Sequence, residues 1–505
     1  MAASDAHVIV SVDVKDVRFP TSLEGDGSDA MVILTTSLAL KAKWPNIYYR
    51  RGTMIVVQAV KSMCHLVVGQ KLKNIFDDFS SFWRKLTSDS QLRWVGPEKG
   101  VIHLATAAIV NALWDLWGKA EGKPVWKLLT DMTPEQIVSL VDFRYITDAL
   151  TPDEALAILK QHQSTKHERE AQLVEQGYPA YTTSVAWLGY SDDKIEKLGK
   201  QALDEGWTNV THYDKHTDPD YSCAYVILTT SLALKGHGLT FTIGKGTEIA
   251  TGGANRAAEI CKKVAVSSAG KASAPRSLPK CQYVRHTGVR LTRACLNLNK
   301  HMESTTIRSV ARMVTSRHSA HMHIETALTE IEHILLMFVE VLGVPGGPDM
   351  LALQPLGIGV ATGEQCHNRV MFKQFLQAGA MQFCQIDSCR LGGVNEIIAV
   401  LLLAAKFKVP VCPHAGGLGL CELVQHMAIF DYICVSASLE NRVTEFVDHL
   451  HEHFVNPVII RNAAYIPPQA PGYSSELKQE SLDAHTYPGG STWQMLFHKG
   501  IFKSN

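Results

Sequence analysis

Four ionisable residues stand directly after apolar stretches in the last third of the chain: Glu364, Asp387, His414 and Glu440. Their spacings are 23, 27 and 26 residues, about one strand–loop–helix unit each. In a barrel of alternating strands and helices, active groups lie at the C-terminal ends of successive strands and closure brings them together. Each residue alone would be an ordinary loop residue, but four in phase predict one shared site.

An imidazole and a carboxylate at neighbouring strand ends suit general acid–base chemistry. Asp387 can accept a hydrogen bond from one ring nitrogen of His414, which fixes the tautomer and leaves the other nitrogen free. Taken singly, Asp387 would be interpreted as a helix N-cap and His414 as a buried imidazole with satisfied hydrogen bonds. Glu364 and Glu440 would be solvated loop carboxylates. The regular spacing favours the site interpretation.

The elements that must position these residues are predicted from periodicity. LGIGVATGEQ, MQFCQIDSCR, VPVCPHAGG and ICVSASLENR are predicted strands with their loops, and a helix is expected after each. Further upstream, a strand is expected at 8–14 and another at 178–190. Residues 101–129 predict a long helix that stops at Gly122 and Pro124, followed by a short one.

Composition describes an ordinary folded protein. The 505 residues are 46% hydrophobic and 19% charged with a formal net charge of zero, which favours two or more domains and no polyanionic partner. Eleven scattered cysteines contain no CxxC pair, and the first 20 residues lack the pattern of a secretory signal. No apolar run of about 18 residues occurs. We therefore expect a cytoplasmic or mitochondrial-matrix protein, not secreted and without a membrane span.

Two irregularities interrupt the pattern. The decapeptide VILTTSLALK occurs at 32–41 and again at 226–235, with no longer period that would indicate a solenoid. Residues 252–320 hold 13 Lys or Arg against two acids. Such a segment could track a phosphate backbone, but it lacks spaced aromatics for base stacking, so a nucleic-acid partner is not expected. One hypothesis for both irregularities is a misassembled coding sequence.

Three other groups of side chains are weaker candidates for chemistry. The histidines of 318–333 lack the ligand spacing and cysteine pair of a zinc site, so we interpret them as coincidence. The DHLHEH segment at 448–453 is predicted to be a solvated turn. Cys366 and Cys412 flank site residues, and we expect them to be packing thiols.

Several motifs resemble the enolase superfamily, in its mandelate racemase-like branch. IVNALWDLWGKAEGKPVWKLL resembles the helix that closes the capping domain. LRWVGPEKG, ATGEQCHNRVMFKQ, QIDSCRLGG, VCPHAGGLGLCELVQH and VSASLENR resemble the acid-sugar dehydratases that act on L-fuconate. The resemblance covers about 8–31, 54–208 and 354–505. The block at 216–248 also matches, but out of order, since in the family it follows GSDAM.

The resemblance implies an α/β fold, with an α+β N-terminal capping domain plus a (β/α)7β TIM-like barrel that is incomplete or distorted in 209–353. The expected divisions begin with the capping domain at 1–155, which has an anomalous stretch at 32–53, and the start of the barrel at 156–208. An anomalous segment follows at 209–353, then the second half of the barrel at 354–465 and a C-terminal tail at 466–505.

The chemistry implied is Mg²⁺-dependent removal of water from an acid sugar such as L-fuconate. A base takes the proton α to the carboxylate, and an acid then helps the β-hydroxyl to leave. By resemblance, Glu364 is the third carboxylate ligand of Mg²⁺. Asp387 orients His414, the catalytic acid or base. Glu440 contacts the substrate from the opposite side.

The chain departs from the family pattern at its base and metal ligands. Thr211 and Tyr213 stand where the family has a Lys-x-Lys pair, and the DAN-type and EEP-type turns are missing from 210–353. We therefore expect impaired activity in a hydro-lyase for a small acid sugar. The alternative is a catalytically inactive relative that serves as a binding or regulatory protein. A third and weaker hypothesis is a protein that binds RNA through its basic segment. The chain could also assemble as a homo-oligomer.

Overall fold

The computed structural model describes residues 7–23, 34–35, 41–42, 51–96, 98–187, 192–207, 210–213, 222–242, 336–338 and 359–502. By Cα proximity the chain divides into two compact units. One is Met1–Gly244 with Ala361–Asn505, and the other is Lys245–Val360, of which β8 (Leu336–Phe338) is the described strand. The basic stretch at 252–320 and the histidines of 318–333 lie outside the described residues.

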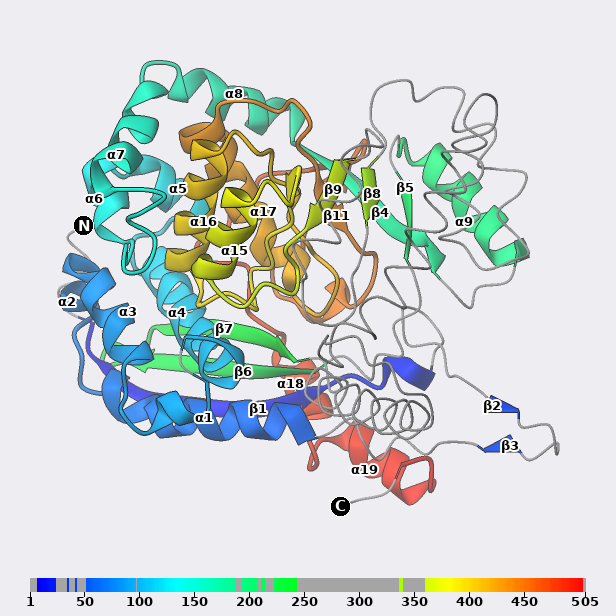
Figure 1. The fold of residues 1–505 in the computed structure, drawn as a ribbon. Coiled ribbons are helices and arrows are strands. Elements are labelled where there is room, and N and C mark those ends of the chain that lie inside the picture. The colour runs from blue at the N-terminus through cyan, green and yellow to red at the C-terminus, as the bar shows by residue number, and fades with distance from the viewer. Residues whose placement is uncertain are drawn as a thin grey trace, which may run out of the picture. The chain divides into compact units, whose positions relative to one another are not determined.

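A three-stranded antiparallel sheet forms the base of the first unit (Figure 1). Its order is β1 (Ile9–Arg18), β6 (Ser222–Thr230) and β7 (Lys235–Thr242), so β6 is central. The strand predicted at 8–14 is confirmed and runs on to Arg18. β6 and β7 come from the block that matches out of order. That block therefore supplies two of the three strands of this sheet, despite its displaced place in the sequence.

The repeated decapeptide pairs its two ends in the same register in both copies. In the first copy, β2 (Leu34–Thr35) and β3 (Lys41–Ala42) pair with Leu34 opposite Ala42. In the second copy, Leu228 lies opposite Gly236, which is the same register 194 residues later.

Two glycines explain why the second copy lies against α4 (Gly100–Ala120). A Cβ at Gly236 would overlap the carbonyl oxygen of Ala112, and a Cβ at Gly238 would overlap its backbone nitrogen. The equivalent positions after the first copy hold Ala42 and Trp44. Because only glycine permits this approach of strand and helix backbones, the return strand of the first hairpin cannot take the place of β7.

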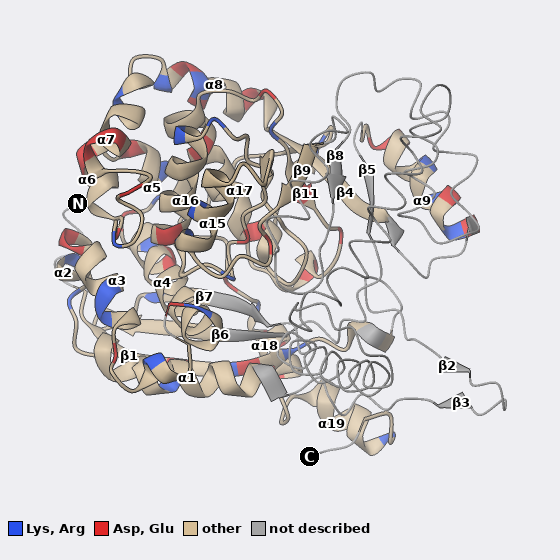
Figure 2. Ribbon diagram, in the orientation of Figure 1, with Lys and Arg blue, Asp and Glu red and all other residues tan. Residues whose placement is uncertain are grey.

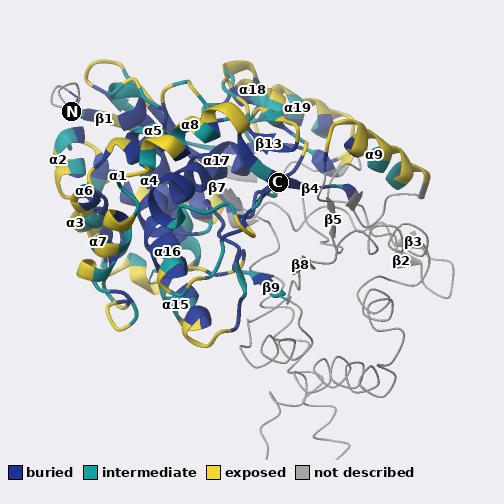
Figure 3. Ribbon diagram, turned by 90° about the horizontal axis from the view of Figure 1, so that it is seen from above, coloured by how far each residue is buried: buried dark blue, intermediate teal, exposed yellow. Residues whose placement is uncertain are grey.

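Four helices pack against α4. They are α1 (Arg51–Val67), α2 (Leu72–Asp77), α3 (Phe79–Thr87) and α5 (Val125–Asp131). The same part of the chain also contains α6 (Pro134–Ser139) and the short 3-10 turns η2 (Thr21–Leu23) and η3 (Leu92–Trp94). As predicted, the long helix ends just before Gly122 and Pro124. Of the described helices, α4 is the one long and apolar enough to cross a membrane, but 83% of its apolar window is buried. Figure 3 shows it deep within the fold, as a core helix.

Parallel strands form an open arc beside this cap. The strands are β4 (Tyr178–Trp187), β5 (Val210–Tyr213), β9 (Gly359–Thr362), β10 (Phe383–Cys384) and β11 (Thr444–Phe446). β4 pairs with β5 and β11, and β9 pairs with β10. Parallel bridges at Val411 and His414 continue from β10, and the Glu445 N–H donates to Pro413 O at 3.2 Å. The described strands do not close into a barrel, as expected for an incomplete one.

Helices alternate with the strands of the arc. α7 (Pro152–Gln161) and α8 (Lys166–Gln176) precede β4, and α9 (Asp192–Asp204) follows it. α15 (Arg369–Gln377) follows β9, α16 (Val394–Lys406) follows β10, and α17 (Leu420–Phe430) follows the bridge at His414. Acidic and basic side chains are interspersed along α8 and α9 (Figure 2), in keeping with the balanced charge of the chain. The strand–helix rhythm predicted from three of the four motifs is confirmed.

The fourth motif, ICVSASLENR, is not a strand. Its apolar residues continue α17 as a π-helical turn, η5 (Asp431–Ser436), and the strand β11 begins only at Thr444. A short apolar run cannot be assigned to strand or buried helix by periodicity alone, which is why the prediction failed here. The fourth strand therefore lies several residues later in the chain than expected.

The segment predicted as a C-terminal tail is packed. It follows η6 (His451–His453), β12 (Ile460–Arg461) and β13 (Ala464–Tyr465), and it contains α18 (Gln479–His485) and α19 (Ser491–His498). The Trp493 indole N–H donates to Arg18 O at 3.0 Å, and the Tyr487 N–H donates to Asp16 O at 2.7 Å. These bonds attach the C-terminal helices to β1.

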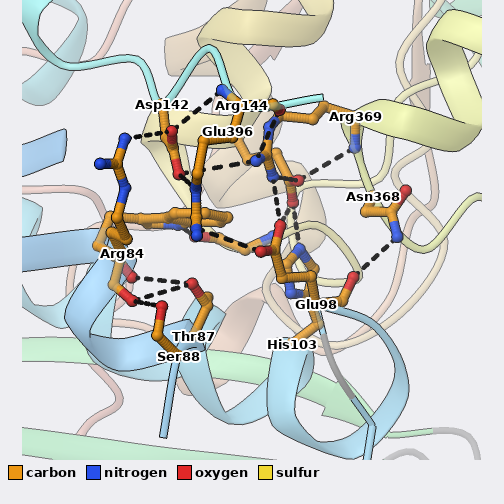
Figure 4. Close-up of polar contacts among 12 residues, drawn as sticks. Arg84, Thr87, Ser88, Glu98, His103, Asp142, Arg144, Asn368, Arg369 and Glu396 are labelled. Atoms are coloured by element: carbon orange, nitrogen blue, oxygen red, sulfur yellow. Dashed lines mark hydrogen bonds and ion pairs between the residues drawn. The ribbon is translucent and has the colours of Figure 1, made fainter. Parts of the chain in front are cut away.

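A buried charge cluster joins α4 to α15 and α16 (Figure 4). Arg369 Nη1 lies 3.1 Å from carboxylate oxygens of both Glu98 and Glu396. His103 contacts the other oxygen of Glu396. Burial alone raises the pKa of Glu396, but His103 and Arg369 outweigh it and lower that pKa to about 2. The start of α15, five residues after Glu364, is therefore fixed to the cap by ionised groups.

Candidate active site

The strand ends of the arc place three of the predicted residues together. Glu364 follows β9 and is 6% exposed, while Asp387 and His414 are 1% and 2% exposed. Gly363 turns the chain between β9 and Glu364 with φ +136°, and a Cβ there would overlap Phe372. A glycine is thus required for Glu364 to point into the arc.

His414 and Asp387 form the predicted pair. Nδ1 of His414 lies 3.0 Å from Oδ2 of Asp387. Oδ1 of Asp387 accepts hydrogen bonds from the backbone N–H groups of Cys389 at 2.7 Å and Arg390 at 2.9 Å. The carboxylate is thereby held by backbone on one oxygen and aligns the imidazole with the other. Nε2 of His414 is left to face the site.

Two carboxylates lie near Nε2 of His414. Oε1 of Glu364 is 3.6 Å away and Oε2 of Glu445 is 3.8 Å away. A Cβ at Gly416 would lie 2.9 Å from the same nitrogen. Gly416 therefore packs closely against the imidazole, at a position where a side chain would crowd the ring.

Glu440 does not belong to this group. It is exposed in the loop before β11, whereas Glu445 on β11 is fully buried. Glu445 accepts hydrogen bonds from Thr183 Oγ1 at 3.1 Å and from the Ala415 N–H at 2.9 Å. The fourth residue of the site is therefore Glu445, and the prediction of Glu440 was wrong. The β-branched and aromatic residues of VTEFV, at 443–447, were the signal that could have located this strand.

The carboxylates keep His414 protonated at neutral pH. Burial alone lowers the pKa of His414, but Glu364, Glu445 and the hydrogen bond to Asp387 outweigh it and raise that pKa to about 9. Burial raises the pKa of Glu445. An imidazolium whose second proton is turned away from Asp387, toward Glu364 and Glu445, is suited to donate a proton, so His414 fits the part of a general acid.

Arg390 was missed by reasoning from the sequence. Its Nη1 contacts Oε1 of Glu364, lies 3.2 Å from the carbonyl oxygen of Glu364, and is 3.5 Å from Oδ2 of Asp387. It stands three residues after Asp387 in the DSCR turn. Its place in the same turn as Asp387 was the one signal in the sequence, and it did not indicate the contact with Glu364.

The described residues do not fit a Mg²⁺ site. Within the part of the chain that the structure describes, no group of three or more His, Cys, Asp or Glu side chains could hold a metal ion. Glu364 is the expected ligand, and Arg390 already contacts its carboxylate. Mg²⁺ needs near-octahedral oxygen ligands, and one carboxylate paired with a guanidinium does not supply them.

The cysteines next to the site are packing thiols, as predicted. Cys366 and Cys412 are buried. Burial raises the pKa of Cys366 to about 12 and also raises that of Cys412, so neither is a nucleophile at neutral pH. The DHLHEH segment, in contrast, is not a solvated turn. Nδ1 of His451 lies 2.7 Å from Oε1 of the buried Glu422.

Comparison with known proteins places this geometry in a family. Residues 45–130 match the mandelate racemase / muconate lactonizing enzyme N-terminal domain, and residues 319–481 match the enolase C-terminal domain-like family. Mitochondrial enolase superfamily member 1 of Homo sapiens is 46% identical over 97% of this chain and 98% of its own length. This chain belongs to the enolase superfamily.

Other members of the superfamily extend the comparison. The crystal structure of the human protein has a TM-score of 0.68 at 42% identity, and covers 97% of this chain and 98% of its own. L-galactonate dehydratase of Hypocrea jecorina is 40% identical over 95% of this chain and 94% of its own length. L-talarate/galactarate dehydratase from Salmonella typhimurium LT2, liganded with Mg and L-lyxarohydroxamate, has a TM-score of 0.52 at 16% identity over 95% and 93% of the two chains. That last likeness concerns the fold alone.

The two positions at which a Lys-x-Lys pair was expected lie in β5. Thr211 and Tyr213 lie in this strand, which pairs with β4. The stretch from 214 to 221 and most of 243–358 lie outside the described residues. The described part of the candidate site is therefore the group that follows β9 and β10, with His414 and β11.

Proposed function

We propose that this chain carries an acid-sugar dehydratase site, for substrates of the L-fuconate class, that is catalytically impaired. The observation that carries the proposal is the position of His414, aligned by Asp387 and facing Glu364 and Glu445. Relatives named as dehydratases of acid sugars support a hydro-lyase role for the family. A small acid sugar is accordingly the expected partner.

The retained half of the reaction is departure of the β-hydroxyl. Nε2 of His414 would give its proton to that hydroxyl as the C–O bond breaks, and the product is water. Asp387 stabilises the imidazolium before the transfer and fixes the ring afterwards. A positioned acid of this kind contributes on the order of 10²–10⁴ in rate.

The other half, removal of the α-proton, lacks a base on β5. The hydroxyls of Thr211 and Tyr213 are far less basic at neutral pH than a lysine amine with a lowered pKa. Loss of a positioned base costs on the order of 10²–10⁴ in rate. Binding of Mg²⁺ would require further carboxylate ligands in addition to Glu364. The missing base and the missing metal ligands both support an impaired dehydration activity.

A second candidate function is binding without turnover. The pairing of Arg390 with Glu364 favours it, because it leaves an intact, charged and buried site that does not depend on a metal. Such a chain could bind an acid sugar, or act as a regulatory partner, with no chemistry at all.

Two assays on the purified full chain separate these functions. L-fuconate and L-galactonate would be titrated by calorimetry, and dehydration would be followed in the same samples, with the Hypocrea enzyme as the positive control on L-galactonate. Slow turnover that needs His414 supports the impaired dehydratase. Binding without turnover supports the second function. Absence of both from a folded chain contradicts the acid-sugar assignment.

A further inference from the structure

A second cation stands in the site beside His414. Arg390 is 12% exposed, and its Nη1 contacts both the carboxylate and the backbone oxygen of Glu364. The same nitrogen is 3.5 Å from Asp387. The guanidinium therefore bridges the loop after β9 and the loop after β10.

We propose that Arg390 is the resident cation of this site and takes the place at Glu364 that a divalent metal ion would otherwise occupy. The proposal rests on the site assigned above, but it concerns charge and metal binding, not turnover. It follows from the arrangement of charges within the described residues.

The buried carboxyl groups of the site favour such a cation. Glu364, Asp387 and Glu445 are all buried around the imidazole of His414. A buried charge without a partner is strongly destabilising. The guanidinium of Arg390 supplies a positive charge that cannot be lost by deprotonation in proteins. It supplies this charge at the carboxylate of Glu364.

The position of Arg390 also disfavours binding of a metal ion at Glu364. A divalent cation approaching Glu364 would have to displace a guanidinium that is held by two oxygens of the same residue and faces Asp387. The ion would gain no cluster of further ligands among the described residues. The site should therefore be stable without Mg²⁺ and indifferent to its addition.

Thermal unfolding of the full chain tests this directly. We expect Arg390→Met to lower the midpoint temperature by about 5 °C or more, as for the breaking of a buried pair. Arg390→Lys should lose less, since it keeps the charge. Adding Glu364→Gln to Arg390→Met should restore part of the loss, because the unpaired carboxylate is removed. Lys406→Met is the matched control, since its pair with Glu154 is exposed and should matter little.

Magnesium provides the second arm. Millimolar Mg²⁺ should leave the midpoint of the unaltered chain unchanged. A rise that disappears in Glu364→Gln would show that a divalent ion is the cation of the site and would overturn the proposal. So would an unchanged midpoint in Arg390→Met, or no restoration in the double variant. If Arg390→Met does not fold, the lysine variant and the Mg²⁺ titration still decide, and neither depends on whether L-fuconate is turned over.

Discussion

Glu445 and His414 face each other from neighbouring positions of the arc, with Oε2 of Glu445 3.8 Å from Nε2 of His414. The backbone reinforces this relationship, because the Glu445 N–H donates to Pro413 O at 3.2 Å. The carboxylate opposite the imidazole is thus carried by a strand hydrogen-bonded to the one that carries the histidine. A site built on strands is held more precisely than one built on loops.

Exchanging Glu445 for glutamine should disturb His414, and the same change at Glu440 should not. Glu445→Gln removes a negative charge beside the imidazolium, so the pKa of His414 should fall. Glu440 is exposed and outside the site, so Glu440→Gln serves as the matched control. NMR titration of the histidine ring signals measures both. An effect of Glu440→Gln equal to that of Glu445→Gln would contradict the placement of the fourth residue.

The charge on His414 should make stability depend on pH. Its pKa is raised from 6.5 to about 9 in the folded chain, so its contribution is present in full below about pH 6.5. That contribution is lost as the pH rises through about 9, and is on the order of 3 kcal/mol. Denaturant unfolding at pH 6.5 and pH 9.5 should show a smaller difference for His414→Gln than for the unaltered chain. An identical difference in both would count against a protonated His414.

The close contact of β7 with α4 should make Gly238 intolerant of a side chain. Gly238→Ala places a methyl group against the helix backbone, and overpacking of this kind costs roughly 1–3 kcal/mol. Gly489→Ala is the control, because nothing lies within 4 Å of its added Cβ. Chemical denaturation compares the two. Equal stability of both variants would mean that β7 does not lie against α4 as described.

The buried cluster around Arg369 should be needed for the cap to remain attached to the barrel helices. Arg369→Met leaves Glu396 with one positive partner fewer in a fully buried position, a change that costs about 3–5 kcal/mol. Arg84→Met should cost far less, because Arg84 is 48% exposed at its pair with Asp142. Unfolding free energies of the two variants provide the comparison, and similar losses would argue against a structural role for the cluster.

Reasoning from the sequence succeeded where apolar runs were long and ended at glycine. The strand and turn around Gly363, and the helices that follow β9 and β10, were predicted for this reason. It failed at Ile433–Val435, because a short apolar run that continues a helix was interpreted as a strand. As a result, Glu440 was predicted in the site instead of Glu445.

Tertiary contacts explain the other omissions. The pairing of Arg390 with Glu364 joins residues from two strand ends, and periodicity carries no information about such a contact. The displaced block joined the sheet of β1 because Gly236 and Gly238 fit α4. That fit depends on the helix surface, and sequence order did not indicate it.

The central proposal is that the chain carries the acid of a dehydratase site, His414, without a lysine base on β5. Dehydration of L-fuconate by the purified full chain, with Mg²⁺ supplied, tests it beside His414→Gln. The account predicts that a folded chain binds L-fuconate yet forms product at a rate at least about 10²-fold below that of an enzyme with a positioned base. Rapid turnover that His414→Gln abolishes would contradict it, and would mean that other residues supply the missing base and metal ligands.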